Sequence, residues 1–123
     1  MTKNKNIPSI FRLAKNVSKN SDHRYKMGSV IVKNGKPLSV GFNQIKSNPN
    51  APYLGLHCEQ HALQNCGKEN LKGCSIFVYR ENRVGNPAMA KPCKNCQKIL
   101  KENGFRWMYY SVDEYPFWEC EKL

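Results

Sequence analysis

Two short stretches of the sequence carry side chains that bind metal ions, and they lie far apart in the chain. The first holds His57 and, two residues later, Glu59. The second is a Pro-Cys-x-x-Cys motif, in which Cys93 and Cys96 have the spacing of a metal-binding pair. If both stretches contribute to one site, the chain must fold so that they meet. This requirement constrains the fold more than any other feature of the sequence.

The donor set indicates the kind of metal site to expect. One imidazole and two thiolates suit zinc, and three protein ligands leave a fourth position for water, which distinguishes catalytic from structural zinc sites. Both stretches are predicted to begin helices, where the positive end of the helix dipole lowers the pKa of a cysteine thiol. Glu59 is then free to take up and release protons beside the metal. The sequence thus predicts His57, Cys93 and Cys96 as zinc ligands and Glu59 as the acid–base group.

A closed structural zinc site is the alternative. His57 and His61 lie four residues apart on one face of the predicted helix and could complete a tetrahedron with the two cysteines. Structural fingers, however, usually place the cysteine pair first with a short separation between the pairs, and this alternative leaves Glu59 without a function. We expect His61 to be packed or hydrogen-bonded. Cys58 should pack in the core, because it points about 100° away from His57 on the helix.

Length and composition fit one domain over residues 1–123, in which 40% of the residues are hydrophobic. There is no apolar run near the length of a membrane span and no hydrophobic signal segment at the polar start, so we expect a cytoplasmic protein without a membrane partner. Six cysteines in such a chain indicate thiols or metal ligands and not disulfides. Cys66, Cys74 and Cys120 are expected to be small buried residues.

The net charge of +11 is unevenly distributed, with basic residues concentrated in residues 1–36. A basic face suits a partner that carries phosphate, either a nucleotide or a nucleic acid. Lysines spread along helices also serve simply as a solubilising surface. Charge alone leaves both interpretations open.

Hydrophobic periodicity and turn residues predict the order of the elements. Helices are expected over residues 7–20, 57–66 and 92–103. Strands are expected over residues 27–33, 37–42, 74–80, 105–111 and 117–122, with a hairpin turn at Asn34-Gly35 and loops over 43–56 and 81–91. This order predicts a mixed sheet covered by helices. Residues 112–123 are too few for a helical crossover before another strand, so the last two strands must be antiparallel.

The sequence resembles the cytidine/deoxycytidylate deaminase superfamily over nearly its whole length. His-x-Glu…Pro-Cys-x-x-Cys is the signature of the zinc deaminases, Gly-Ser-Val-Ile-Val at residues 28–32 resembles the family's first strand, and Gly41-Phe42-Asn43 is similar to the end of its second strand. The resemblance implies a three-layer α/β/α fold with a mixed five-stranded sheet, zinc as the cofactor, and assembly into dimers or tetramers. It assigns His57, Cys93 and Cys96 to zinc and Glu59 to proton transfer.

The resemblance also implies the reaction, which is hydrolytic removal of an amine from a nucleobase with release of ammonia. We expect a cytosine nucleotide or nucleoside of the dCMP or cytidine type as the substrate. Asn43 corresponds to the family residue that contacts the sugar, although an Asn there is also a common turn residue. Arg24 and Lys26 are candidates for a 5′ phosphate, or surface charges. Tyr110 is a candidate for stacking on the base, or a packed strand residue.

A cytosine deaminase acting on single-stranded DNA or RNA is the second hypothesis. The charge of +11 and three aromatic residues with an exposed appearance favour it: Tyr53, Tyr115 and Trp118. The editing relatives of the antiviral type carry Ser-Trp-Ser before Pro-Cys, whereas residues 89–91 here are Met-Ala-Lys. Their last strands are also parallel, which the short C-terminal segment excludes here. A zinc protein without catalytic activity is the third hypothesis.

Overall fold

The computed structural model describes residues 8–45, 56–67 and 70–123, and every helix and strand predicted from the sequence is present in it. The helices are α1 (Ile10–Ser18), α2 (Cys58–Cys66) and α3 (Lys94–Glu102). The strands are β1 (Met27–Lys33), β2 (Lys36–Phe42), β3 (Ser75–Glu81), β4 (Pro87–Ala88), β5 (Trp107–Ser111) and β6 (Trp118–Lys122). Most of the loop predicted over 43–56, including Tyr53, lies outside the described residues.

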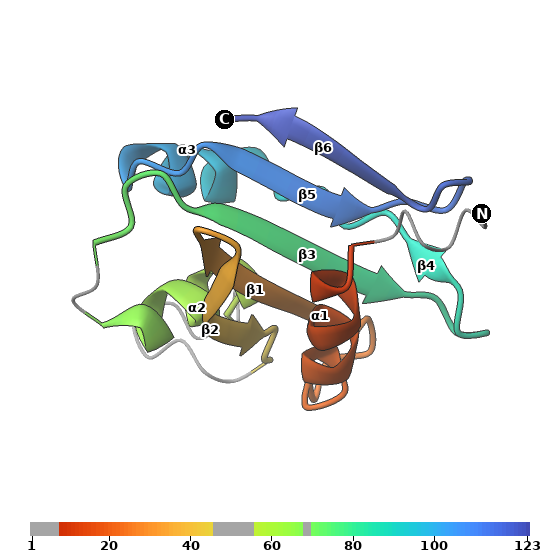
Figure 1. Cartoon of the computed structure of the whole chain (residues 1–123). Coiled ribbons are helices and arrows are strands. Elements are labelled where there is room, and N and C mark those ends of the chain that lie inside the picture. The colour runs from red at the N-terminus through yellow and green to blue at the C-terminus, as the bar shows by residue number, and fades with distance from the viewer. Residues whose placement is uncertain (1–7, 46–55, 68–69) are drawn as a thin grey trace.

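The strands form one mixed sheet in the order β2-β1-β3-β5-β6, with β4 paired to β3 (Figure 1). β1 is antiparallel to both β2 and β3, whereas β3 and β5 are parallel and are joined through α3. The predicted antiparallel return of the last strand is confirmed, with Trp107 opposite Lys122 and Ser111 opposite Trp118. The fold class expected from the sequence is thus present.

Strand β4 corrects the prediction of an unbroken loop over 81–91. Pro87 lies opposite Glu81, and Ala88 lies opposite Arg80. The side-chain oxygen of Asn82 accepts hydrogen bonds from two backbone N–H groups within this turn. A strand of two residues is too short to show the alternation by which strands are detected in a sequence.

Helices cover both faces of the sheet. Figure 1 shows α1 in front of β1 and β3 and α3 behind β5. The core on the α1 face consists of buried residues from the helix and from β1 and β3: Phe11, Ala14, Val30, Val32, Phe77 and Tyr79. The core on the other face joins α2 and α3 to the sheet and includes Ala62, Leu100, Ile76, Val78, Met108 and Tyr110.

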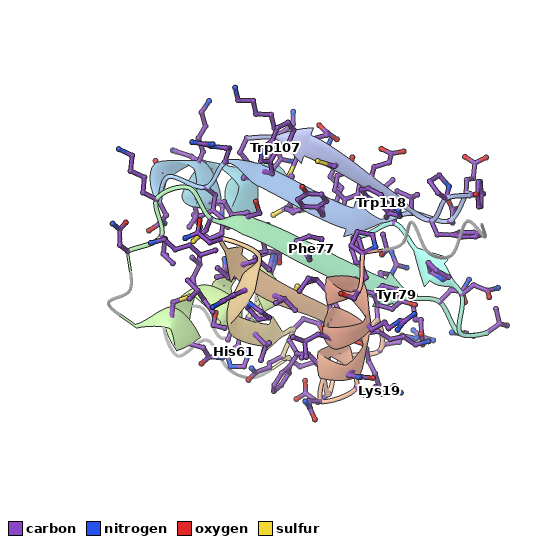
Figure 2. All side chains as sticks on the ribbon, in the orientation of Figure 1. Lys19, His61, Phe77, Tyr79, Trp107 and Trp118 are labelled. Atoms are coloured by element: carbon purple, nitrogen blue, oxygen red, sulfur yellow. The ribbon has the colours of Figure 1, made fainter. Side chains whose placement is uncertain are left out.

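Aromatic rings extend the core on the α1 face from Phe77 in the central strand β3 to Trp118 in the edge strand β6, both labelled in Figure 2. The rings of Phe77 and Tyr109 stack with centroids 4.2 Å apart, and Phe11 meets Phe77 edge-on at 5.2 Å. The ring centroids of Trp118 and Tyr109 lie 6.0 Å apart. Trp118 is half-buried, so it is less exposed than its sequence context suggests. Tyr115, by contrast, is 60% exposed.

Two of the three scattered cysteines are buried as expected, and the third is not. Cys66 and Cys74 lie in the core, but Cys120 is exposed. The physical reason is its place on β6, the edge strand of the sheet, where most side chains face solvent.

Glycines allow the helices to lie directly on the strands. A Cβ atom at Gly41 in β2 would lie 2.3 Å from the backbone nitrogen of Ala62, and one at Gly28 in β1 would lie 2.1 Å from the carbonyl oxygen of Ala14. Both positions therefore exclude any side chain. The contact at Gly41 fixes the position of α2, which carries His57 and Glu59 at its start. No helix in the described residues is long and apolar enough to cross a membrane.

Candidate active site

The two distant metal-binding stretches meet at neighbouring helix starts. His57 precedes the first residue of α2, and its backbone N–H donates to the side-chain oxygen of Gln60 at 3.3 Å. It is positioned by Leu56, which pairs with Gln44 through two backbone hydrogen bonds just beyond β2. Cys93 occupies the same position before α3, and its Sγ accepts from the N–H of Cys96 at 3.5 Å.

Three side chains converge there. His57 Nδ1 lies 3.3 Å from Cys96 Sγ and 3.9 Å from Cys93 Sγ, and the three atoms lie within 4.8 Å of one another. A tetrahedral zinc ion with ordinary Zn–N and Zn–S bonds separates its ligand atoms by about 3.5–3.8 Å. The distances and the chemistry of the three donors therefore fit a zinc ion.

Burial alone would not favour a thiolate at this site. Cys96 is 1% exposed, and burial raises the pKa of its thiol, as does the negative charge of Glu59. Burial therefore opposes the thiolate that the helix start is expected to favour. Coordination to a metal ion deprotonates a thiol outright. A cation at the site would therefore stabilise the thiolate form of Cys96, which burial disfavours.

Glu59 lies in the first turn of α2 and is almost completely buried, with 3% of its surface exposed. The thiol of Cys58 donates to its Oε1 at 3.2 Å. Glu59 and Cys58 both line the same cavity as His57 and Cys93. A buried carboxylate beside the metal-binding cluster is suited to proton transfer.

His61 does not belong to the cluster. Its Nδ1 accepts from the backbone N–H of Phe42 at 3.1 Å and lies 3.2 Å from Gln44 Nε2, and its ring meets the Phe42 ring edge-on. Among the described residues, the potential metal ligands that cluster are His57, Cys93 and Cys96. The geometry thus opposes a closed site that uses both histidines.

A cavity of about 470 Å³ opens beside the cluster. Its lining comes from both helix starts, from the ends of β1, β2 and β3, and from the segment before β1: His23, Tyr25, Met27, Asn43, Gln44, Leu56, His57, Cys58, Glu59, Arg80, Lys91 and Cys93. This volume is in the range of small-molecule sites.

Asn43, the predicted sugar contact, lines this cavity and is 8% exposed. Its side-chain oxygen accepts from the N–H of Met27 at 2.8 Å, and its Nδ2 donates to the carbonyl oxygen of Tyr25 at 2.7 Å. These bonds hold the segment before β1 in place. The amide has a second Nδ2 hydrogen, which is available to a ligand.

Three other sequence candidates do not line the cavity. Lys26 is exposed, and its Nζ donates to the carbonyl oxygen of Ser21. Arg24 is exposed, with its guanidinium 5.9 Å from the centre of the Tyr25 ring. Tyr110 is 1% exposed in the core and donates its hydroxyl to Glu119 at 3.1 Å and to Glu121. For Tyr110, packing within the strand is the interpretation that matches this geometry.

The cations that do line the cavity, Arg80 and Lys91, were missed. Arg80 was the last residue of the strand predicted over 74–80, which is parallel to β5. Ligands in α/β sheets bind at the carboxyl ends of parallel strands, so this position was a usable signal. Lys91 directly precedes the Pro-Cys-x-x-Cys motif.

Known proteins share the sequence pattern and the fold of this chain. A family model described as the cytidine and deoxycytidylate deaminase zinc-binding region matches residues 4–112. The chain is similar to the apo dCMP deaminase of cyanophage S-TIM5, with 28% identity and a TM-score of 0.61 over 82% of this chain and 78% of that one. No curated protein matches the sequence.

Two further solved structures share the fold. The S-TIM5 enzyme in complex with dCMP and dUMP has 23% identity and a TM-score of 0.66, covering 93% of this chain and 86% of that one. A cytidine deaminase from Burkholderia pseudomallei has 19% identity and a TM-score of 0.65, covering 93% and 90%.

Proposed function

The chain belongs to the family of the cytidine and deoxycytidylate deaminase zinc-binding region, and on this premise we propose that it converts a cytosine nucleotide or nucleoside, of the dCMP or cytidine type, to its uracil form. The observation that carries the proposal is the convergence of His57, Cys93 and Cys96 beside buried Glu59 in one cavity. The similar S-TIM5 structures, one of which contains dCMP and dUMP, support the choice of substrate.

In this proposal His57, Cys93 and Cys96 would hold the zinc ion, beside the cavity that His57 and Cys93 line. Zinc lowers the pKa of a coordinated water to roughly 7, which supplies hydroxide at neutral pH. Three ligands and one open position are the arrangement of catalytic zinc sites.

Glu59 carries the protons. It accepts the proton that the attacking water gives up and passes it to the ring nitrogen beside the amine-bearing carbon. The water oxygen adds to that carbon, and Glu59 transfers the remaining proton of the added hydroxyl to the amine. The carbon–nitrogen bond then breaks, and the amine leaves as ammonia. Asn43 contributes its free amide hydrogen to the sugar.

The substitution Glu59→Gln tests the assignment, because it removes the proton carrier without removing a zinc ligand. We expect one zinc ion per chain by elemental analysis, as in the unmodified protein, and a deamination rate lower by at least about 100-fold. Glu102→Gln, at the exposed end of α3, is the control and should keep the rate.

Two results would oppose this account. An unchanged rate in Glu59→Gln would show that the carboxylate carries no proton. Loss of zinc in that variant would indicate that Glu59 is itself a zinc ligand and not a proton carrier.

A further inference from the structure

We infer that Arg80 is the substrate-binding residue that selects the 5′-monophosphate of a pyrimidine nucleoside over the free nucleoside. This inference rests on the proposed function, because it names the form of the substrate that enters the same site. It also moves the expected phosphate contact from Arg24 and Lys26, which do not line the cavity, to a cation that does.

The position of Arg80 is well defined. Its backbone belongs to β3 and lies opposite Met27, and its N–H donates to Ser111 Oγ at 3.0 Å. The guanidinium lies 5.2 Å from the centre of the Tyr25 ring, and Nη1 donates to the carbonyl oxygen of Met89 at 3.3 Å. These contacts hold the side chain at the wall of the cavity.

The charge of Arg80 is not balanced within the described part of the chain. No carboxylate there forms an ion pair with it, and its Nε is buried without a hydrogen-bond partner. A buried donor without a partner is unfavourable, because it has lost its hydrogen bonds to water. Lys91, the other cation of the lining, is already paired with Glu121 at 2.9 Å. Arg80 is therefore the lining cation that is available to an anion.

A nucleoside monophosphate matches this arrangement of groups. Its base belongs near Glu59 and the zinc ligands, and its sugar near Asn43. Both of these parts are uncharged, so the phosphate is the part that an arginine can recognise. The planar guanidinium offers paired donors to phosphate oxygens, and such charge-assisted bonds are the strong ones in proteins.

Binding of the products dUMP and deoxyuridine, measured by calorimetry, tests the inference without catalysis. The unmodified protein should bind dUMP more tightly by about 30- to 100-fold, and Arg80→Gln should lower that preference to less than about threefold. Arg83→Gln is the matched control, because Arg83 is exposed and does not line the cavity. Equal binding of the two ligands by the unmodified protein, or an undiminished preference in Arg80→Gln, would overturn the inference.

Folding is checked by thermal melting. If Arg80→Gln does not fold, Arg80→Met replaces it, because an unbranched apolar side chain still packs on Tyr25 while the charge is lost. The same outcomes then apply to Arg80→Met.

Rates with dCMP and deoxycytidine separate this inference from the proposed function. Selective binding of dUMP that depends on Arg80, without deamination of either substrate, would refute the deaminase while the role of Arg80 stands. Deamination of both substrates at equal kcat/KM would support the deaminase and refute the role of Arg80.

Discussion

At the residue scale, the C-terminal strand reaches the rim of the site through one carboxylate. Glu121 pairs with Lys91 and accepts a hydrogen bond from Tyr110. The hydrogen bond from Tyr110, followed by that from Lys91, lowers the pKa of Glu121 below its ordinary value. The charge of Lys91 is thereby balanced within the protein.

Removal of the Tyr110 hydroxyl should reverse part of this effect. In Tyr110→Phe we expect the pKa of Glu121, followed by carbon-13 NMR of its carboxyl group, to rise towards the ordinary value. A lowered folded-state pKa stabilises the protein above the unfolded-state pKa, and this contribution is lost as the pH falls through the folded-state value. The variant should therefore lose less stability on acidification.

Tyr79→Phe is the control for this measurement, because the Tyr79 hydroxyl donates to Glu81 and not to Glu121. A Glu121 titration that is the same in all three proteins would contradict the assigned cause.

Local patterns predict a cluster of potential metal ligands better than they predict the lining of a cavity. His57, Cys93 and Cys96 could be found because the donors and their spacing are written in short motifs. Arg80 and Lys91 reach the cavity through tertiary packing, and the sequence indicates it only through the place of Arg80 at a strand end and of Lys91 beside the Pro-Cys-x-x-Cys motif. Tertiary packing also decides the position of Tyr110, whose place in the core depends on strands β5 and β6 lying together.

At the scale of elements, the site depends on how closely α2 lies on β2. A methyl group at Gly41 would approach Cys58 O and Ala62 N to 2.5 and 2.3 Å. We expect Gly41→Ala to lower the free energy of unfolding by about 3 kcal/mol, because the helix backbone must move. Gly85→Ala, at a position with φ +89° and open space, should cost only about 1 kcal/mol.

Denaturant unfolding of both variants provides the comparison. Equal losses at the two glycines would mean that the contact between α2 and β2 is not as tight as described.

Most elements were predictable because they are long enough to show their periodicity. The strand predicted over 27–33 agrees with the structure, as does the antiparallel return of the last strand, which followed from chain length. The sequence does not predict β4, because two residues are too few to show the alternation of apolar and polar side chains that indicates a strand. The exposure of Cys120 was missed because the sequence does not reveal which strand lies at an edge.

At the scale of the whole molecule, a zinc ion at this site joins the starts of α2 and α3, which belong to distant parts of the chain. Free zinc at about 100 times its dissociation constant stabilises the folded state by about 2.7 kcal/mol. We therefore expect chelation to lower the melting temperature by about 10 °C and added zinc to restore it.

Two histidine variants make this measurement specific. His57→Ala should abolish the response to zinc, whereas His61→Ala, one helical turn away, should keep it. Loss of the response in both variants would favour the closed structural site.

Deamination of a small cytosine compound can be measured with a panel of three substrates. The zinc-loaded protein is incubated with dCMP, cytidine and a single-stranded oligonucleotide, and the uracil product and ammonia are quantified. We predict conversion of dCMP or cytidine with one ammonia released per uracil formed. Failure to convert any of the three would contradict the account, and conversion of the oligonucleotide alone would contradict its choice of substrate.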